Sequence, residues 1–224
     1  SLADDISNRD LRAEIRRLSG DKSVTGIMLH MPLPSHIDGA RVMFAIDVVK
    51  DVEGVNPANI GYLLYKHIVN APCTAMAAVE LIKHTEVPLE GAEAVVVGAS
   101  HIVGKPISLL LTEQGATVTL CHIATRDLKF HTQRADILVV AAGKAGLITA
   151  GHVREGACVI DVGINRITAA DGTKKTVGDV DFDGLKEKAA FITPVPGGVG
   201  PMTVAILMEN TLRSAEIQAG VRAG

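Results

Sequence analysis

Hydrophobic positions in the first part of the chain follow mainly helical periods. Apolar residues at helical spacing predict a helix over Asn8 to Leu18, and a short apolar run predicts a strand over Thr25 to His30. Further helices are predicted over Gly39 to Val48 and directly after Pro72, where Thr74 is the candidate N-cap. A single strand is too little for a parallel layer, so we expect residues 1–88 to form only part of an α/β domain.

From Ala94 onward the pattern changes to short β-rich runs that alternate with helical segments. These runs are predicted as strands over Ala94 to Val97, Thr117 to Cys121, Ile137 to Ala141, Cys158 to Val162 and Ala190 to Thr193. Short apolar runs joined by helices are typical of a parallel sheet covered on both faces. The expected fold class is α/β, with a Rossmann-like parallel-sheet dinucleotide-binding domain over residues 89–224 after the partial N-terminal α/β domain. The final helix, residues 202–217, is expected to pack back onto the N-terminal part.

Composition excludes several classes of function. The 224 residues carry a formal net charge of −3, with no basic face for a phosphate backbone, so no nucleic-acid partner is expected. The apolar runs are too short to cross a bilayer and no signal sequence opens the chain, so we expect no membrane partner and a cytoplasmic location. The cysteines, Cys73, Cys121 and Cys158, are odd in number and widely spaced, which predicts reduced, buried thiols. The histidines are scattered, and no metal site is predicted.

The segment after the strand at Ala94 to Val97 has the context of a phosphate-binding loop. Gly98 permits a tight turn, and Gly104 lets the following helix approach the strand, so that amides at the helix N-terminus face a pyrophosphate. The spacing is Gly-x-Ser-x-x-x-Gly rather than Gly-x-Gly-x-x-Gly, so this pattern alone leaves an ordinary strand-to-helix turn as the alternative.

The end of the next strand bears on which dinucleotide is bound. A typical NAD site has a carboxylate there, about 20 residues after the loop, which holds the ribose hydroxyls. Residues 121–126 contain no carboxylate but do contain His122 and Arg126, which are candidates to meet a 2′-phosphate. The predicted cofactor is therefore NADP, with NAD as the alternative.

Several segments together resemble the methylenetetrahydrofolate dehydrogenase/cyclohydrolase family, in the same order and spacing. They are Met31 to Pro34, Lys50 to Gly54, Pro72 to Thr74, Val97 to Pro106, Asp161 to Arg166 and Thr193 to Thr203. The last is the most specific, because it places three glycines and three prolines in eleven residues.

The resemblance implies a homodimeric, two-domain enzyme with its active-site cleft between a folate-binding N-terminal domain and the dinucleotide domain. Such an enzyme oxidises 5,10-methylenetetrahydrofolate by hydride transfer to NADP, and then hydrolyses the methenyl cation to 10-formyltetrahydrofolate.

By position, the resemblance assigns roles to residues of this chain. The catalytic positions are His30 and Glu53. The tetrahydrofolate substrate would contact Leu29, Met31, Pro32, Gly200 and Pro201. The cofactor would contact Gly98, Ala99, Ser100, Val103, Gly104, His122, Ile123, Ile164 and Thr203. Within this set, Ile164 would lie on the nicotinamide side and Thr203 at the junction of the cofactor and folate sites.

The chain departs from the family at positions that affect chemistry. The family's catalytic lysine, in a Tyr-x-x-x-Lys motif, belongs to a helix that precedes Ser1; Tyr62 and Lys66 fit the same spacing but follow the Asp51 to Gly54 loop and are interpreted as a decoy. His30 replaces a glutamine, and Glu53 replaces the aspartate that grips the pterin. Ala99 stands where the family usually has arginine, which weakens the case for NADP.

Three hypotheses remain open on the sequence. The first is a folate-interconverting enzyme whose chain here lacks an N-terminal segment; we expect it to retain hydride transfer and to lose cyclohydrolase activity, with His30 as a partial substitute base. The second is a catalytically degraded relative that binds folate or dinucleotide without turnover. The third is another Rossmann-type oxidoreductase, against which the Pro194 to Thr203 loop argues.

Overall fold

The computed structural model describes residues 2–66, 68–168 and 172–221 and divides the chain into two compact units. The first unit comprises Ser1–Cys73 with Leu207–Gly224, and the second comprises Thr74–Ile206. The first division lies earlier than the expected boundary after residue 88, because the sequence signal was the onset of strands at Ala94, whereas the helix before them already belongs to the compact unit of the sheet.

The first unit is helical. Its elements are α1 (Asn8–Gly20), α2 (Gly39–Met43), α3 (Pro57–Leu63) and the C-terminal part of α8 (Val199–Gln218). Helix α1 begins where the Ser7 hydroxyl accepts the backbone N–H of Asp10, at 3.1 Å. The core of the unit is a cluster of buried aliphatic residues: Leu11, Ile15, Ile27, Ile37, Val42 and Ile46.

Three predictions in this unit and at its edge need correction. The strand predicted over Thr25 to His30 is a single parallel bridge between Ile27 and Asp51, because the described residues of this unit contain no neighbouring strand to extend the pairing. The helix predicted over Gly39 to Val48 ends at Met43. Thr74 lies inside α4 (Cys73–Lys83) and is not its N-cap.

The second unit is built on a parallel sheet with strand order β2-β1-β3-β4-β7. The strands are β1 (Glu93–Val97), β2 (Thr117–Cys121), β3 (Ile137–Val140), β4 (Cys158–Asp161) and β7 (Phe191–Ile192). The five predicted strands are thus confirmed, with small differences at their ends. The central strands β3 and β4 are buried along their whole length, as expected for a sheet covered on both faces.

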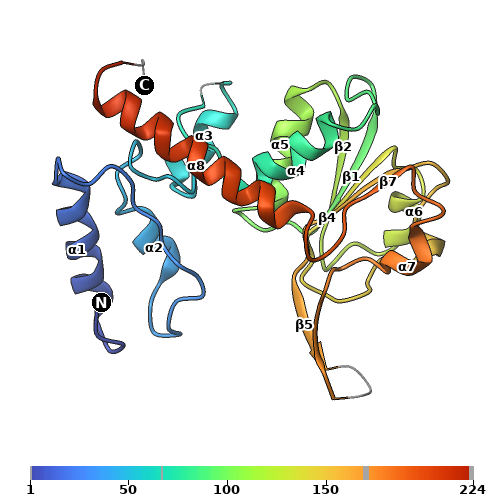
Figure 1. Cartoon of the computed structure of the whole chain (residues 1–224), viewed down its shortest axis with the longest axis horizontal. Coiled ribbons are helices and arrows are strands. Elements are labelled where there is room, and N and C mark those ends of the chain that lie inside the picture. Colours follow the sequence, from blue (N-terminus) through green and yellow to red (C-terminus); the bar gives the residue numbers. More distant parts are fainter. Residues whose placement is uncertain (1, 67, 169–171, 222–224) are drawn as a thin grey trace. The chain divides into compact units, whose positions relative to one another are not determined.

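Helices cover both faces of this sheet. In Figure 1, α4 and α5 (Gly104–Glu113) lie on one face, while α6 (Leu128–Thr132) and α7 (Phe182–Leu185) lie on the other. The short helix η1 (Ala150–His152) follows β3, and the first turns of α8 complete the unit. No helix in the described part of the chain is long and apolar enough to span a membrane.

An antiparallel hairpin, β5 (Asn165–Thr168) and β6 (Lys174–Val177), extends from the second unit (Figure 1). The sequence pattern does not predict this hairpin. Both strands are mostly exposed and polar, so they lack the alternating or continuous apolar pattern from which strands are predicted.

Candidate functional site

The register of the parallel sheet brings the loops that follow β1, β2, β3 and β4 to one edge. Val97 pairs with both Cys121 and Val140, and Val140 pairs with Asp161, so these strands end together. Ligands of open α/β sheets bind at this carboxyl edge. Except for Thr203, which lies in α8, the predicted cofactor residues of this unit follow those strands, and they therefore lie at one edge of the sheet.

The loop after β1 requires glycine at two positions. Gly98 has φ +112°, and a Cβ atom there would overlap the carbonyl oxygen of Ala141. A Cβ atom at Gly104 would overlap the carbonyl oxygen of Gly98, so the start of α5 packs directly against the end of β1. This close approach is the arrangement that the sequence predicted for a phosphate-binding loop.

Ser100 organises the N-terminus of α5. Its Oγ accepts the backbone N–H groups of Val103 and Gly104, at 3.2 and 3.4 Å, and its carbonyl accepts the N–H of Lys105, at 3.1 Å. These bonds fix the first turn of the helix, where the helix dipole favours an anion. Val103 and Gly104 therefore shape the loop, while Gly98, Ala99 and Ser100 line the cleft beside it.

That cleft, of about 540 Å³, brings together loops from three strands of the sheet. Its lining includes Gly98, Ala99, Ser100, His122, Ile123, Thr125, Ala141, Ala142 and Lys144. The side chain of Ile123 is fully exposed, and His122 is fixed by its Nδ1 atom, which accepts the N–H of Ala124 at 3.1 Å. Arg126 does not line the cleft, whereas Lys144, which the sequence analysis missed, does. Its place three residues after the end of a predicted strand was the signal that could have identified it.

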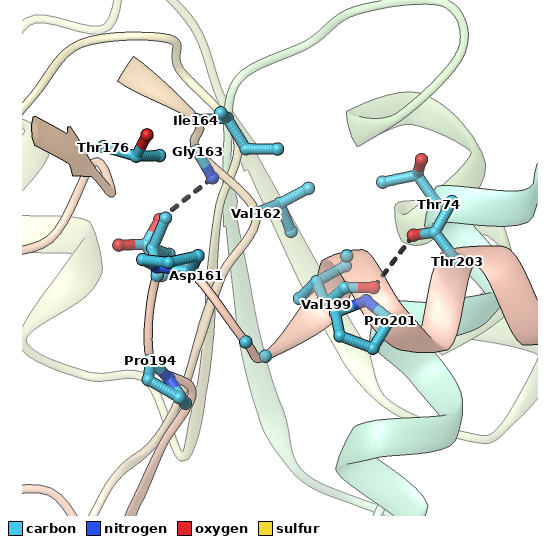
Figure 2. Close-up of a pocket in the computed structure, with 15 residues that line it drawn as sticks. Thr74, Asp161, Val162, Gly163, Ile164, Thr176, Pro194, Val199, Pro201 and Thr203 are labelled. Carbon is cyan, nitrogen blue, oxygen red and sulfur yellow. Dashed lines mark hydrogen bonds between the residues drawn. The ribbon is translucent and has the colours of Figure 1, made fainter. Parts of the chain in front are cut away.

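A second pocket, of about 370 Å³, lies between the loop after β4 and the start of α8 (Figure 2). It joins Ile164, predicted on the nicotinamide side, to the predicted folate contacts Gly200 and Pro201 and to the junction residue Thr203. The hydroxyl of Thr203 donates to the carbonyl of Val199, at 3.0 Å. Thr74 and Thr176, which were not among the predicted site residues, also line this pocket.

Asp161, at the end of β4, forms part of the wall of the second pocket. Its Oδ1 accepts the N–H of Gly163, at 2.9 Å, which fixes the turn that carries Ile164 (Figure 2). Burial raises the pKa of the Asp161 carboxyl, although hydrogen bonds from several backbone amides act in the opposite direction. The Asp161 carboxylate thus stabilises the backbone of this loop by accepting its amide hydrogen bonds.

In the first unit, the structure brings together the predicted folate residues Leu29, His30 and Glu53. The Glu53 Oε2 atom accepts the backbone N–H of Leu29, at 3.1 Å. Burial is the main cause that raises the pKa of the Glu53 carboxyl; the Leu29 N–H and the charge of His30 lower it, and the charge of Asp51 raises it. Met31 and Pro32 follow in the chain with exposed side chains.

The backbone that carries Glu53 is held by two buried groups from distant segments. The N–H of Cys73 donates to the Glu53 carbonyl, at 3.2 Å, and its thiol donates to the Val52 carbonyl, at 3.3 Å. Asn210 Nδ2 donates to the carbonyls of Val52 and Ala71, at 2.9 and 3.0 Å. Burial raises the pKa of the Cys73 thiol to about 12, so it keeps the proton that it donates. Asn210 was not among the predicted site residues.

The Tyr-x-x-x-Lys pattern at Tyr62 and Lys66 does not form one helical face. Tyr62 lies in α3, which ends at Leu63, whereas Lys66 lies beyond that end with φ +57°. Residues four apart face the same side only within a continuous helix. The geometry therefore agrees with the interpretation that Tyr62 and Lys66 match the spacing of the family's motif without being that motif.

Two family models cover most of the chain. The model described as "Tetrahydrofolate dehydrogenase/cyclohydrolase, NAD(P)-binding domain" matches residues 72–219. The model described as "Tetrahydrofolate dehydrogenase/cyclohydrolase, catalytic domain" matches residues 1–53. Among curated proteins, Bifunctional protein FolD 3 of Roseobacter denitrificans is 54% identical over 96% of this chain and 74% of its own length. Bifunctional protein FolD of Nitrosomonas europaea is 50% identical over 95% of this chain and 70% of its own length.

Comparison with solved structures points to the same family. The bifunctional FolD methylenetetrahydrofolate dehydrogenase/cyclohydrolase of Campylobacter jejuni superposes with a TM-score of 0.90, at 46% identity, over 96% of this chain and 75% of that chain. The Trypanosoma brucei enzyme, solved with NADP and an inhibitor, also has a TM-score of 0.90, at 38% identity, over 99% of this chain and 76% of that chain. The chain belongs to the tetrahydrofolate dehydrogenase/cyclohydrolase family.

Proposed function

We propose that this protein oxidises 5,10-methylenetetrahydrofolate to methenyltetrahydrofolate with NADP, and that the intact enzyme hydrolyses the product to 10-formyltetrahydrofolate. The observation that carries the proposal is the second pocket, which joins Ile164 to Gly200 and Pro201. Hydride transfer needs donor and acceptor carbons held about 3–3.5 Å apart. A pocket shared by a nicotinamide-side residue and folate-side residues provides such a place.

The first cleft fits the rest of a dinucleotide. Gly98 and Gly104 leave room for the backbone to approach a pyrophosphate, and the amides at the start of α5 favour its charge. His122 and Lys144 line the cleft and supply groups that can meet a 2′-phosphate, which supports NADP over NAD. The bound nicotinamide supplies the hydride acceptor. Ala99, Ser100, Val103 and Ile123 complete the predicted contacts, with Thr203 in the second pocket.

On the folate side, Glu53 is the proposed anchor of the pterin. Its Oε2 accepts the N–H of Leu29, while Oε1 accepts no hydrogen bond from the described residues and can accept one from a ring N–H of the substrate. Met31 and Pro32 follow His30 in the chain and supply exposed apolar surface, and His30 is the proposed base for hydrolysis. The first compact unit is the proposed folate part and the second, which begins at Thr74 rather than after residue 88, is the proposed NAD(P) part.

We expect the enzyme to act as a homodimer in the cytoplasm, without a nucleic-acid or membrane partner. The family resemblance is the ground for the homodimer, the slight negative charge argues against a nucleic-acid partner, and the three free cysteines support a reducing compartment.

A spectrophotometric assay with methylenetetrahydrofolate and either NADP or NAD tests the function, with reduced nicotinamide and methenyl absorbance followed together. We expect a higher kcat/KM with NADP.

Glu53→Gln removes the anchoring charge and is expected to raise the KM for the folate by about tenfold or more, since buried or partly buried charge-assisted hydrogen bonds contribute about 1.5–3 kcal/mol. Glu53→Asp keeps the charge and is the matched control. Dinucleotide binding without turnover would instead favour the catalytically degraded relative.

A further inference from the structure

The carboxylate of Asp179 is completely buried and joins two loops of the second unit. Its Oδ2 accepts the backbone N–H groups of Ala142 and Gly143, at 2.6 and 2.8 Å. Its Oδ1 accepts the N–H of Lys144 and the side-chain Nδ2 of Asn165, both at 2.8 Å. Four donors therefore converge on one side chain, which is 0% exposed.

This arrangement satisfies a buried charge entirely with neutral donors. Consecutive backbone N–H groups that point to one place form an anion-binding concavity, and here the protein's own carboxylate occupies it. A buried carboxylate is tolerated only when hydrogen bonds replace its lost hydration. The loop that supplies these amides is therefore pinned to Asp179.

The two loops joined in this way line different cavities. Ala142 and Lys144, after β3, line the cleft beside the phosphate loop. Asn165 directly follows Ile164, which lines the second pocket. Asp179 itself lines neither of these cavities.

We propose that Asp179 is a positioning residue that holds the loop after β3 and the loop after β4 in one arrangement, so that both ends of the dinucleotide meet correctly placed walls. The inference rests on the proposed function and deepens it, because it assigns cofactor affinity to a residue outside the cofactor's contacts. Without Asp179 the two loops are no longer linked, and an extended ligand that needs both at once loses affinity.

A second carboxylate supports the same linkage. Asp161 accepts the backbone N–H of Asp179 on Oδ1, at 3.0 Å, and that of Val180 on Oδ2, at 2.9 Å. A Cβ atom at Gly163 would overlap the Asp179 carboxyl, so the turn before Ile164 packs directly on it. Asp161 in β4 thus fixes the position of Asp179. Asp179 in turn fixes the backbone amides after β3 through its hydrogen bonds to them.

Titration of the full chain with NADP and with adenosine 2′,5′-bisphosphate, the adenosine half of NADP, tests the proposal. Asp179→Asn places an NH2 group against two N–H donors, and we expect affinity to fall for both ligands. If the linked arrangement is populated about a tenth of the time, the apparent Kd rises about tenfold. Asn165→Ala frees only the loop after β4, so the Kd for NADP should rise while the Kd for adenosine 2′,5′-bisphosphate stays as in the unmodified protein.

Leu185→Ala is the control for lost stability, because Leu185 is fully buried in the same unit but lines neither cofactor cavity. Unchanged NADP affinity in Asp179→Asn, or an equal loss in Leu185→Ala at matched melting temperature, would overturn the proposal. If Asp179→Asn does not fold, the Asn165→Ala variant decides the question. Unchanged affinity for NADP in Asn165→Ala, or an equal loss of affinity for NADP and for adenosine 2′,5′-bisphosphate, overturns the proposal. An unmodified protein that binds no NADP overturns the proposed function itself.

Discussion

Asn210 shows how a residue far along the chain from the site can determine the geometry of a functional side chain. Its amide nitrogen donates to the carbonyls of Val52 and Ala71 and lies 3.4 Å from the Cys73 sulfur. The Val52 carbonyl belongs to the peptide bond that leads directly into Glu53. Loss of the amide would remove the Asn210 donor from the buried Ala71 carbonyl and would leave the Val52 carbonyl with only the weak Cys73 thiol as donor, which would loosen this peptide.

We predict that Asn210→Leu lowers the free energy of unfolding by about 1–3 kcal/mol, because the buried Ala71 carbonyl loses its Asn210 donor and the Val52 carbonyl keeps only the Cys73 thiol. It should also raise the KM for methylenetetrahydrofolate more than it changes the Kd for NADP, since the displaced group is Glu53. Urea unfolding and steady-state kinetics measure the two effects.

Asn70→Leu is the matched control for this prediction. Asn70 is also buried and also bonds to a backbone carbonyl, that of Val49, and to α8 through Ser214, but it does not touch the peptide before Glu53. An equal rise in the folate KM in Asn70→Leu would show that general loosening of the unit, rather than the position of Glu53, is responsible.

Sequence reasoning finds residues whose chemistry is visible in a local motif, but not partners that only the fold supplies. Glu53 and Ser100 were found because each lies in a short segment with a recognisable pattern. Asn210 lies 158 residues from Val52, in a helix with no chemical signature, and no local pattern connects the two. Asp179 likewise acts through backbone amides, which every residue has.

At the scale of elements, the phosphate loop depends on the contact between the start of α5 and the end of β1. We predict that Gly104→Ala abolishes measurable NADP binding, because the added Cβ would overlap the Gly98 carbonyl and push the helix away from the loop. Fluorescence or calorimetric titration with NADP measures this loss.

Gly61→Ala is the comparison, because Gly61 lies in α3 and a Cβ there would meet nothing within 4 Å. Alanine in a helix is more favourable than glycine by about 0.5–1 kcal/mol, so this variant should be slightly more stable and bind NADP normally. Retained affinity in Gly104→Ala would mean that α5 does not form a wall of the cofactor site.

The parallel strands were predictable because burial on both faces gives them continuous apolar runs, as in β3 with Ile137, Leu138, Val139 and Val140. The hairpin of β5 and β6 was not predictable, because it is exposed and its pairing depends on hydrogen bonds along its backbone. The predicted strand at Thr25 to His30 failed for the opposite reason: an apolar run was present, but it found only one paired residue among the described residues.

At the scale of the whole molecule, each compact unit contains a buried thiol whose ionisation opposes folding. Burial raises the pKa of Cys73, in the first unit, to about 12 and that of Cys158, in the sheet, to about 11. In the unfolded chain both thiols ionise near their ordinary value of 9.0. The folded state therefore binds more protons above that pH, and stability falls as pH rises towards the folded pKa values.

We predict that the free energy of unfolding declines between about pH 9 and pH 11 by up to about 1.4 kcal/mol per pH unit for each thiol. The double variant Cys73→Ser/Cys158→Ser, which cannot ionise at these positions, should show a shallower decline in urea unfolding over the same range. Because each thiol belongs to a different unit, the single variants should each remove part of the decline. A double variant that loses stability as steeply as the unmodified chain would show that alkaline unfolding begins at other groups, and that neither buried thiol controls it.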